Sequence, residues 1–164
     1  MAKPTKYATL ICLILTAVLL AGVILGIYYH LAWIIVLFLL PAVGYEVYRT
    51  MGESTRWASI FMAIVIVAEL IVVAFNINVD LVKLLGSEGQ FVGGYYVQFG
   101  DLRVVFMAVL AILALILFFR TRGKYTRWLA VLIFVGALAI AYTTSPETFK
   151  QLLNIGAQEA LQRI

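Results

Sequence analysis

Long apolar segments are the feature that most constrains how this chain can fold. Each segment has about the length that a helix needs to cross the hydrocarbon core of a bilayer, roughly 20 residues. A segment that spans a bilayer must satisfy its own backbone hydrogen bonds, which favours helices over open sheets. The sequence therefore predicts five transmembrane helices. Their expected ranges are 7–29, 31–48, 57–79, 102–119 and 128–143.

The composition excludes a water-soluble globular domain. Of the 164 residues, 65% are hydrophobic and 12% are charged, whereas a soluble domain has about 45–50% apolar and about 25% charged residues. The net charge of +4 is concentrated at the ends of the apolar segments, which is typical of membrane topology and not of a nucleic-acid-binding patch. We therefore expect an all-α integral membrane protein that contacts the lipid bilayer and binds no nucleic acid.

The chain is expected to divide into a transmembrane bundle and a tail. The bundle covers residues 1–143 and includes an outer loop at 80–101. Within this loop, residues 90–99 contain two aromatic, β-prone runs joined by Gly-Gly, which fit either a two-residue hairpin or an aromatic loop on the bilayer surface. Residues 144–164 are predicted to form an amphipathic helix, because their apolar residues recur three and four positions apart.

Lys and Arg residues predict the orientation in the membrane. If the N-terminus is cytoplasmic, the cytoplasmic side holds Lys3, Lys6, Arg49, Arg56, Arg120, Arg122, Lys124 and Arg127. The outer side then holds Lys83, Arg103, Lys150 and Arg163. Because positively charged loops remain in the cytoplasm, we expect a multi-pass protein of the cell (inner) membrane with its N-terminus inside and its C-terminus outside. If the short fifth helix does not span, the tail would lie in the cytoplasm.

Two loops on the predicted cytoplasmic side have similar sequences. R-T-M-G-E-S-T-R-W at 49–57 and R-T-R-G-K-Y-T-R-W at 120–128 agree at six of nine positions, with an offset of 71 residues. We expect the Arg residues to lie in the headgroup layer, Gly to permit the tight turn, Thr to cap the following helix and Trp to anchor it at the interface. The matched residues that define this interfacial loop motif are Arg49, Gly52, Arg56, Trp57, Arg120, Gly123, Arg127 and Trp128.

The loop match has two explanations. Duplication of a helical hairpin would make the second and third helices equivalent to the fourth and fifth, with the first helix added. Convergence is the alternative, because membrane loops often use Arg, Gly and Trp for the same physical reasons. We favour duplication. The match does not extend well into the helices, where Glu69 aligns with Ile140 and Pro41 with Ile112.

A single carboxylate, Glu69, lies near the middle of the third predicted helix. A charge at this depth is costly and therefore needs an explanation. Asn76 and Asp80 follow seven and eleven residues later, so on a continuous helix all three lie near one face. We expect no basic residue at the depth of Glu69 and no second membrane-embedded carboxylate to pair with it. Thr16 of the first helix is the best partner within the chain.

This polar stripe is open to three explanations. A neutral Glu69 can form a hydrogen bond to another helix of the bundle. It can instead contact a separate subunit, or it can belong to a proton or cation path that is reached from outside. We favour a structural or subunit-contact role over transport.

Catalytic, metal-binding and cofactor-binding sites are not predicted. The single histidine, His30, lies between Tyr29 and Leu31 in a tight interfacial turn, and a lone histidine is a weak signal for haem ligation. The sequence has no phosphate-binding glycine loop, no nucleophile elbow and no pair of cysteines. We therefore expect a protein that is not an enzyme and that has no cofactor.

These features favour a non-catalytic integral membrane subunit that packs within and stabilises a larger membrane protein complex. Its partners would be other membrane subunits or further copies of the chain. The alternative function is a small oligomeric channel or carrier with Glu69 on a proton or cation path. A G-x-x-x-G motif, formed by Gly22 and Gly26, suits close association of the first helix with a neighbour.

Overall fold

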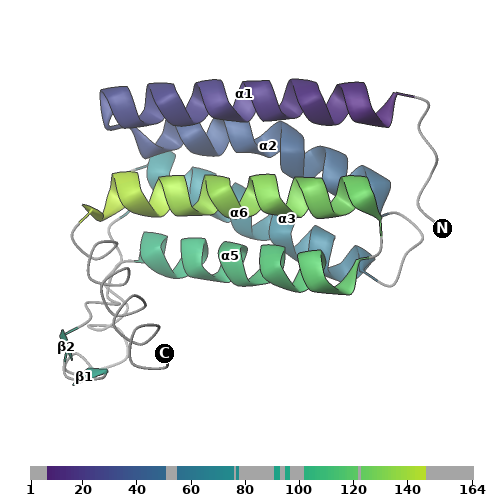
Figure 1. Cartoon of the computed structure of the whole chain (residues 1–164). Coiled ribbons are helices and arrows are strands. Elements are labelled where there is room, and N and C mark those ends of the chain that lie inside the picture. Colours follow the sequence, from purple (N-terminus) through teal and green to yellow (C-terminus); the bar gives the residue numbers. More distant parts are fainter. Residues whose placement is uncertain are drawn as a thin grey trace, which may run out of the picture.

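The structure is a computed structural model that describes residues 7–50, 55–75, 77, 91–92, 95–96, 102–121 and 123–146. Its described part contains five helices, which lie side by side with successive helices running in opposite directions (Figure 1). The helices are α1 (Ala8–Tyr29), α2 (Ala32–Arg49), α3 (Arg56–Ala74), α5 (Leu102–Arg120) and α6 (Lys124–Thr144). The predicted all-helical class is confirmed, with five described helices of which four are long and apolar enough to span a membrane.

The helices have the length and surface expected of membrane spans. Four of them, α1, α2, α3 and α6, are long and apolar enough to cross a membrane, and α5 is apolar over Val105–Arg120. Large apolar side chains such as Leu13, Ile24 and Phe119 are exposed on the outside of the bundle. An apolar outer surface of this extent is unfavourable in water, so the fold is compatible with a multi-pass membrane protein.

Two helix boundaries differ from the prediction. Helix α3 ends at Ala74 instead of residue 79, and the Phe75 N–H donates to the carbonyl of Ile71 to close its last turn. Helix α6 begins at Lys124 instead of Trp128. The polar residues that precede Trp128 are thus already helical, although they do not belong to the apolar segment. With 21 residues, α6 is long enough to span, so the prediction of a short fifth helix is wrong.

The turn between α1 and α2 consists of only two residues. His30 has a left-handed backbone with a φ of 54°, and its N–H donates to the carbonyl of Ile27 at 3.3 Å. The Leu31 N–H donates to the carbonyl of Gly26 at 3.0 Å. This pair of hydrogen bonds is the Schellman motif that terminates many helices. His30 therefore has a structural position at a helix end, and its side chain is exposed.

A short hairpin is present in the predicted outer loop. Strands β1 (Phe91–Val92) and β2 (Tyr95–Tyr96) pair antiparallel, with Phe91 opposite Tyr96. The hairpin alternative is therefore confirmed for these four residues. The rest of the loop at 80–101 and the predicted amphipathic tail after Pro146 lie outside the described residues.

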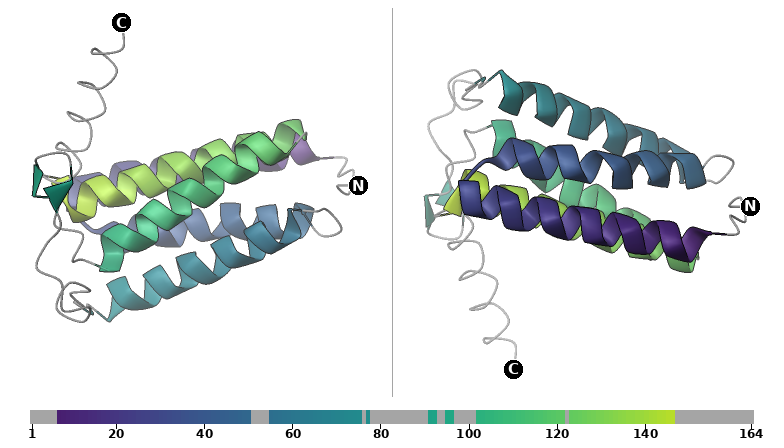
Figure 2. Two further views of the ribbon diagram at one scale, coloured as in Figure 1. Left: turned by 90° about the horizontal axis from the view of Figure 1, so that it is seen from below. Right: turned by 90° about the horizontal axis from the view of Figure 1, so that it is seen from above.

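Four of the helices form a closed core, and α1 lies outside it. Helix α2 packs against α3 and α6, and α5 packs against α6 and α3. Helix α1 packs against α2 and α6 (Figure 2). Exchanging the α2–α3 hairpin with the α5–α6 hairpin leaves the contacts within the four-helix core unchanged. This is the contact pattern that a two-fold relation between the hairpins would produce.

The offset of 71 residues also relates the buried positions of the two hairpins. Both members of each pair are buried in Val36 and Met107, Leu39 and Leu110, Val43 and Ala114, Glu46 and Leu117, Thr50 and Thr121, Thr55 and Thr126, Ser59 and Ala130, Met62 and Ile133, Ile66 and Ala137, and Glu69 and Ile140. Helices α2 and α5 also end at equivalent residues, Arg49 and Arg120. The repeat therefore extends from the loops into the helices as a pattern of burial, although the residue types differ.

Candidate functional site

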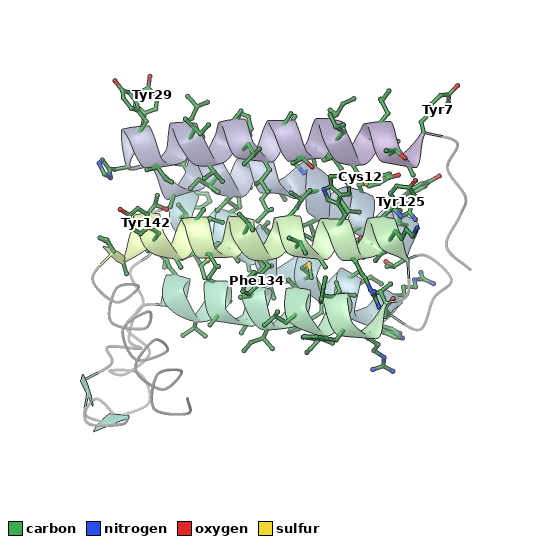
Figure 3. The ribbon with its side chains drawn as sticks, in the orientation of Figure 1. Tyr7, Cys12, Tyr29, Tyr125, Phe134 and Tyr142 are labelled. Atoms are coloured by element: carbon green, nitrogen blue, oxygen red, sulfur yellow. The ribbon has the colours of Figure 1, made fainter. Side chains whose placement is uncertain are left out.

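Buried polar side chains gather at one end of the described bundle. They flank the two repeated loops and comprise Glu46, Arg49, Thr50, Thr55, Ser59, Thr121 and Thr126. Figure 3 labels Tyr7 and Tyr125 at this end, which we call the loop end, and Tyr29 and Tyr142 at the opposite end. Glu69 is the one buried charged or hydroxyl-bearing residue of the described core that lies away from the loop end.

Threonines of the repeated loops terminate helices instead of starting them. The hydroxyls of Thr50 and Thr121 each donate to the carbonyl oxygen four residues earlier, in the last turn of α2 and α5. The residues that precede α3 and α6, Thr55 and Gly123, make no side-chain capping hydrogen bond. The prediction that Thr caps the following helix is therefore wrong. Each of these carbonyls also accepts the backbone N–H of the same threonine, so the hydroxyl adds a second hydrogen bond at the helix end.

Arg49 lies inside the bundle. Its guanidinium carbon is 5.2 Å from the ring centroid of Tyr125 on α6 and 5.9 Å from that of Tyr45 on α2. The side chain is buried, and Arg49 is the last residue of α2, at the loop end. A guanidinium over aromatic faces is stabilised by the negative face of the rings, and here it joins α2 and α6.

The other arginines of the loop motif are exposed. Arg56, Arg120 and Arg127 have exposed side chains. The Arg127 Nε donates to the carbonyl of Thr121 at 2.8 Å, which ties the start of α6 to the end of α5. Gly52 of the motif lies outside the described residues.

Glu46 is a buried carboxylate that the sequence analysis missed. It is fully buried on α2 and lies three residues before Arg49, so the two side chains share a helix face. The expectation that the membrane segments hold no second carboxylate is wrong. The sequence signal for this buried pair was a Glu followed three residues later by an Arg at the end of an apolar segment. Opposite charges buried together offset part of each other's desolvation cost.

Thr16 has partners other than Glu69. Its hydroxyl donates to the carbonyl of Cys12 at 2.7 Å and accepts a hydrogen bond from the indole Nε1 of Trp128 at 3.1 Å. These contacts link α1 to α6, whereas Glu69 is on α3, which packs against α2 and α5. The structure therefore does not bring Thr16 and Glu69 together. Trp128 links α6 to α1 through its hydrogen bond to Thr16.

Glu69 lies closer to the outer end of its helix than the sequence indicated. It is fully buried and follows Arg56, the first residue of α3, by thirteen positions, which corresponds to about 20 Å along the helix. Only five residues of α3 follow it. The predicted stripe requires a helix that continues to Asp80, and α3 ends at Ala74. Asn76 and Asp80 themselves lie outside the described residues.

The two buried carboxylates are too far apart to act as a pair. Glu46 precedes the loop end of α2 by three residues, so it lies about 5 Å from that end by helical rise. Glu69 lies about 20 Å from the same end by the same measure. A separation of roughly 15 Å along the bundle prevents the two groups from sharing a proton or a ligand.

Among the described residues, Arg103 is the basic residue nearest to the level of Glu69. It precedes Arg120, the last residue of α5, by seventeen positions, which places it about 26 Å from the loop end. Its backbone level therefore differs from that of Glu69 by about 6 Å, which an arginine side chain can span. Arg103 is half-buried and lies one turn from the buried Met107, on the core face of α5. Arg103 therefore lies within side-chain reach of the level of Glu69, although its backbone is at a different depth.

Apolar grooves run between the helices of each hairpin. The groove of about 480 Å³ on the α2–α3 hairpin is lined by Val47 and Ala63 among others. The groove of about 120 Å³ on the α5–α6 hairpin has Phe118 and Phe134 at the equivalent positions, and these larger rings account for its smaller volume. Neither groove is lined by Glu46 or Glu69.

Metal ligation has no support in the part of the chain that the structure describes, which contains no group of three His, Cys, Asp or Glu side chains able to bind an ion. No protein-family model, no curated protein and no solved structure matches this chain. The function must therefore be inferred from the residues of this protein alone.

Proposed function

We propose that this protein is an integral membrane protein with five transmembrane helices that acts as a non-catalytic subunit, packing within and stabilising a larger membrane protein complex. The observation that carries the proposal is that two carboxyl side chains are enclosed within the bundle. Glu46 and Glu69 are fully buried, and the grooves described above do not reach them. A transport path requires water or ions to reach the group that it uses, whereas an enclosed carboxyl serves the packing of the bundle.

The proposed orientation places the N-terminus in the cytoplasm and the C-terminus outside, in the cell (inner) membrane. It is supported by the position of the two repeated loops, which lie at the same end of the bundle as the start of α1 (Figure 1). The exposed Arg56, Arg120, Lys124 and Arg127 are all at this end. Lys and Arg near the ends of spanning helices favour the cytoplasmic side.

Purification of the full-length protein in a mild detergent tests the subunit role. We expect one or more other membrane proteins to co-purify in a fixed ratio, measured by native mass spectrometry of the intact assembly. A monodisperse preparation that contains only this chain, from membranes treated with a crosslinker before solubilisation, contradicts the proposal.

Reconstitution into liposomes distinguishes the proposal from a channel or carrier. We expect proton and cation flux equal to that of protein-free liposomes. If the wild-type protein conducts and the Glu69→Gln variant loses flux while keeping its assembly and thermal stability, Glu69 belongs to a transport path and the subunit role is wrong. Glu46→Gln is the matched control, because it removes a carboxylate that lies about 15 Å away along the bundle.

A further inference from the structure

Helix α1 covers only one of two equivalent seams on the four-helix core. It packs on the seam between α2 and α6, which we call the α2–α6 seam. Exchanging the two hairpins converts this seam into the one between α3 and α5, the α3–α5 seam. The five described helices are accounted for by the core and α1, so none of them occupies the α3–α5 seam.

Close approach and two polar contacts hold α1 on the α2–α6 seam. A Cβ atom added to Gly22 would lie 2.3 Å from the Cβ of Phe38, and one added to Gly26 would lie 2.2 Å from the Cγ1 of Ile35. Only glycine therefore permits this spacing between α1 and α2. Small residues let helix backbones approach closely in membranes, and interhelical hydrogen bonds add to the packing. Here the hydrogen bonds are the one from Trp128 to Thr16 described above and the one of 2.8 Å between the hydroxyls of Thr9 and Tyr125.

The equivalent positions on the α3–α5 seam are more exposed. Leu132, one turn from Trp128, is 8% exposed, whereas its equivalent Phe61 is 51% exposed. Trp128 is 45% exposed, and its equivalent Trp57 is 81% exposed. The start of α3 therefore exposes two large apolar side chains, Trp57 and Phe61, whose equivalents on α6 are more buried.

The difference is confined to the positions that face α1. Leu39 and its equivalent Leu110 face the core, and both are buried. Pro41 and its equivalent Ile112 face outward, and both are exposed. At these positions the two hairpins match away from the seams, and among the described helices only the α2–α6 seam has a covering helix.

We propose that the α3–α5 seam is the docking surface for a transmembrane helix of another protein subunit, which packs there as α1 packs on the α2–α6 seam. The proposal rests on the proposed function, because it requires a partner in the membrane. The docked helix carries small residues opposite Phe106 and Val109, the equivalents of Ile35 and Phe38. It also carries a hydroxyl or carbonyl that accepts from the indole N–H of Trp57.

A second copy of this chain fits the seam less well. Its own α1 is already packed on its own α2–α6 seam. Neither α3 nor α5 contains a glycine, so two α3–α5 seams facing each other would bring Trp57 and Phe61 together without the glycines that let α1 approach α2. The occupant with suitable chemistry is therefore a helix from a different protein.

Photo-crosslinking in intact membranes tests this surface. A photoreactive amino acid is placed at Phe61 of the full-length protein, and the adducts are mapped by mass spectrometry. We expect an adduct to a transmembrane segment of another protein, with small residues near the crosslinked position. A Val109→Trp variant, which fills the seam, should reduce this adduct at least fivefold, while the control Leu115→Trp, on the side of α5 that faces the α6 groove, should leave it unchanged.

Other adducts overturn the docking proposal. An adduct to a second copy shows a seam-to-seam dimer, an adduct to lipid alone shows an unoccupied seam, and an adduct that Val109→Trp does not reduce shows contact elsewhere. If a partner co-purifies but Phe61 does not reach it, only the docking surface is wrong. If no partner co-purifies at all, the proposed function fails with it.

Discussion

Single residues decide where charge is placed inside this bundle. Two acids, Glu46 and Glu69, are fully buried, and two bases, Arg49 and Arg103, are buried or half-buried. One acid and one base lie near the loop end, and one of each lies near the other end. Balanced charge at both levels is expected, because an isolated charge in an apolar interior costs several kcal/mol.

Glu69 and Arg103 are predicted to stabilise each other across the α3–α5 contact. In a double-mutant cycle with Glu69→Gln and Arg103→Gln, the double variant should lose less stability than the sum of the single variants, by about 1–3 kcal/mol. The measurement is unfolding of the purified protein in detergent. The control pair is Glu46→Gln with Arg103→Gln, whose residues are separated by about 20 Å along the bundle and should be additive. Additivity in both cycles would show that Glu69 has another partner.

His30 is predicted to be a strained position. A side chain with a Cβ costs about 1–2 kcal/mol in the left-handed region, where glycine is free to lie. His30→Gly should therefore raise the thermal stability slightly, by up to about 1 kcal/mol, and His30→Val should lower it. Unfolding in detergent measures both variants. A loss of stability in His30→Gly would indicate that the imidazole makes a contact that matters.

At the scale of elements, close packing at two glycines holds α1 against α2. The predicted role of Gly22 and Gly26 in helix association is supported by their contacts with α2, which leave no space for a Cβ atom. In contrast, an added Cβ at Gly44 of α2 would meet no atom within 4 Å. The same residue type thus has opposite roles in two adjacent helices.

A matched pair of alanine substitutions tests this difference. Gly26→Ala should destabilise the protein by about 1–3 kcal/mol, the usual cost of overpacking. Gly44→Ala should stabilise it by about 0.5–1 kcal/mol, because alanine loses less backbone entropy in a helix. Thermal unfolding in one detergent measures both. Equal effects of the two substitutions would mean that α1 moves away from α2 at little cost.

At the scale of the whole molecule, the two repeated loops and the start of α1 share one end of the bundle (Figure 1). The predicted orientation can be tested with a thiol reagent that does not cross membranes, because Cys12 is the only cysteine and is buried. In a Cys12→Ser background, Tyr29→Cys should be labelled in intact cells, whereas Lys124→Cys should be labelled only after lysis. The reverse pattern would place the N-terminus outside.

The sequence by itself determined the helical class, the positions of the five helices to within a few residues, the hairpin at Gly93-Gly94 and the repeated loops. These features follow from segment length, from backbone hydrogen bonding and from residue spacing, which can all be read along the chain. The boundaries of α3 and α6 were less accurate, because polar residues can continue a helix beyond its apolar part.

Only the tertiary structure decided which face each side chain takes. It placed Glu46 and Arg49 inside the bundle, gave Thr16 a partner on α6 and left the α3–α5 seam without α1. The physical reason is that these helices are apolar around most of their circumference, so hydrophobicity alone does not distinguish the face toward lipid from the face toward a neighbour. That choice depends on how side chains of particular shapes fit together, as Gly26 fits against Ile35.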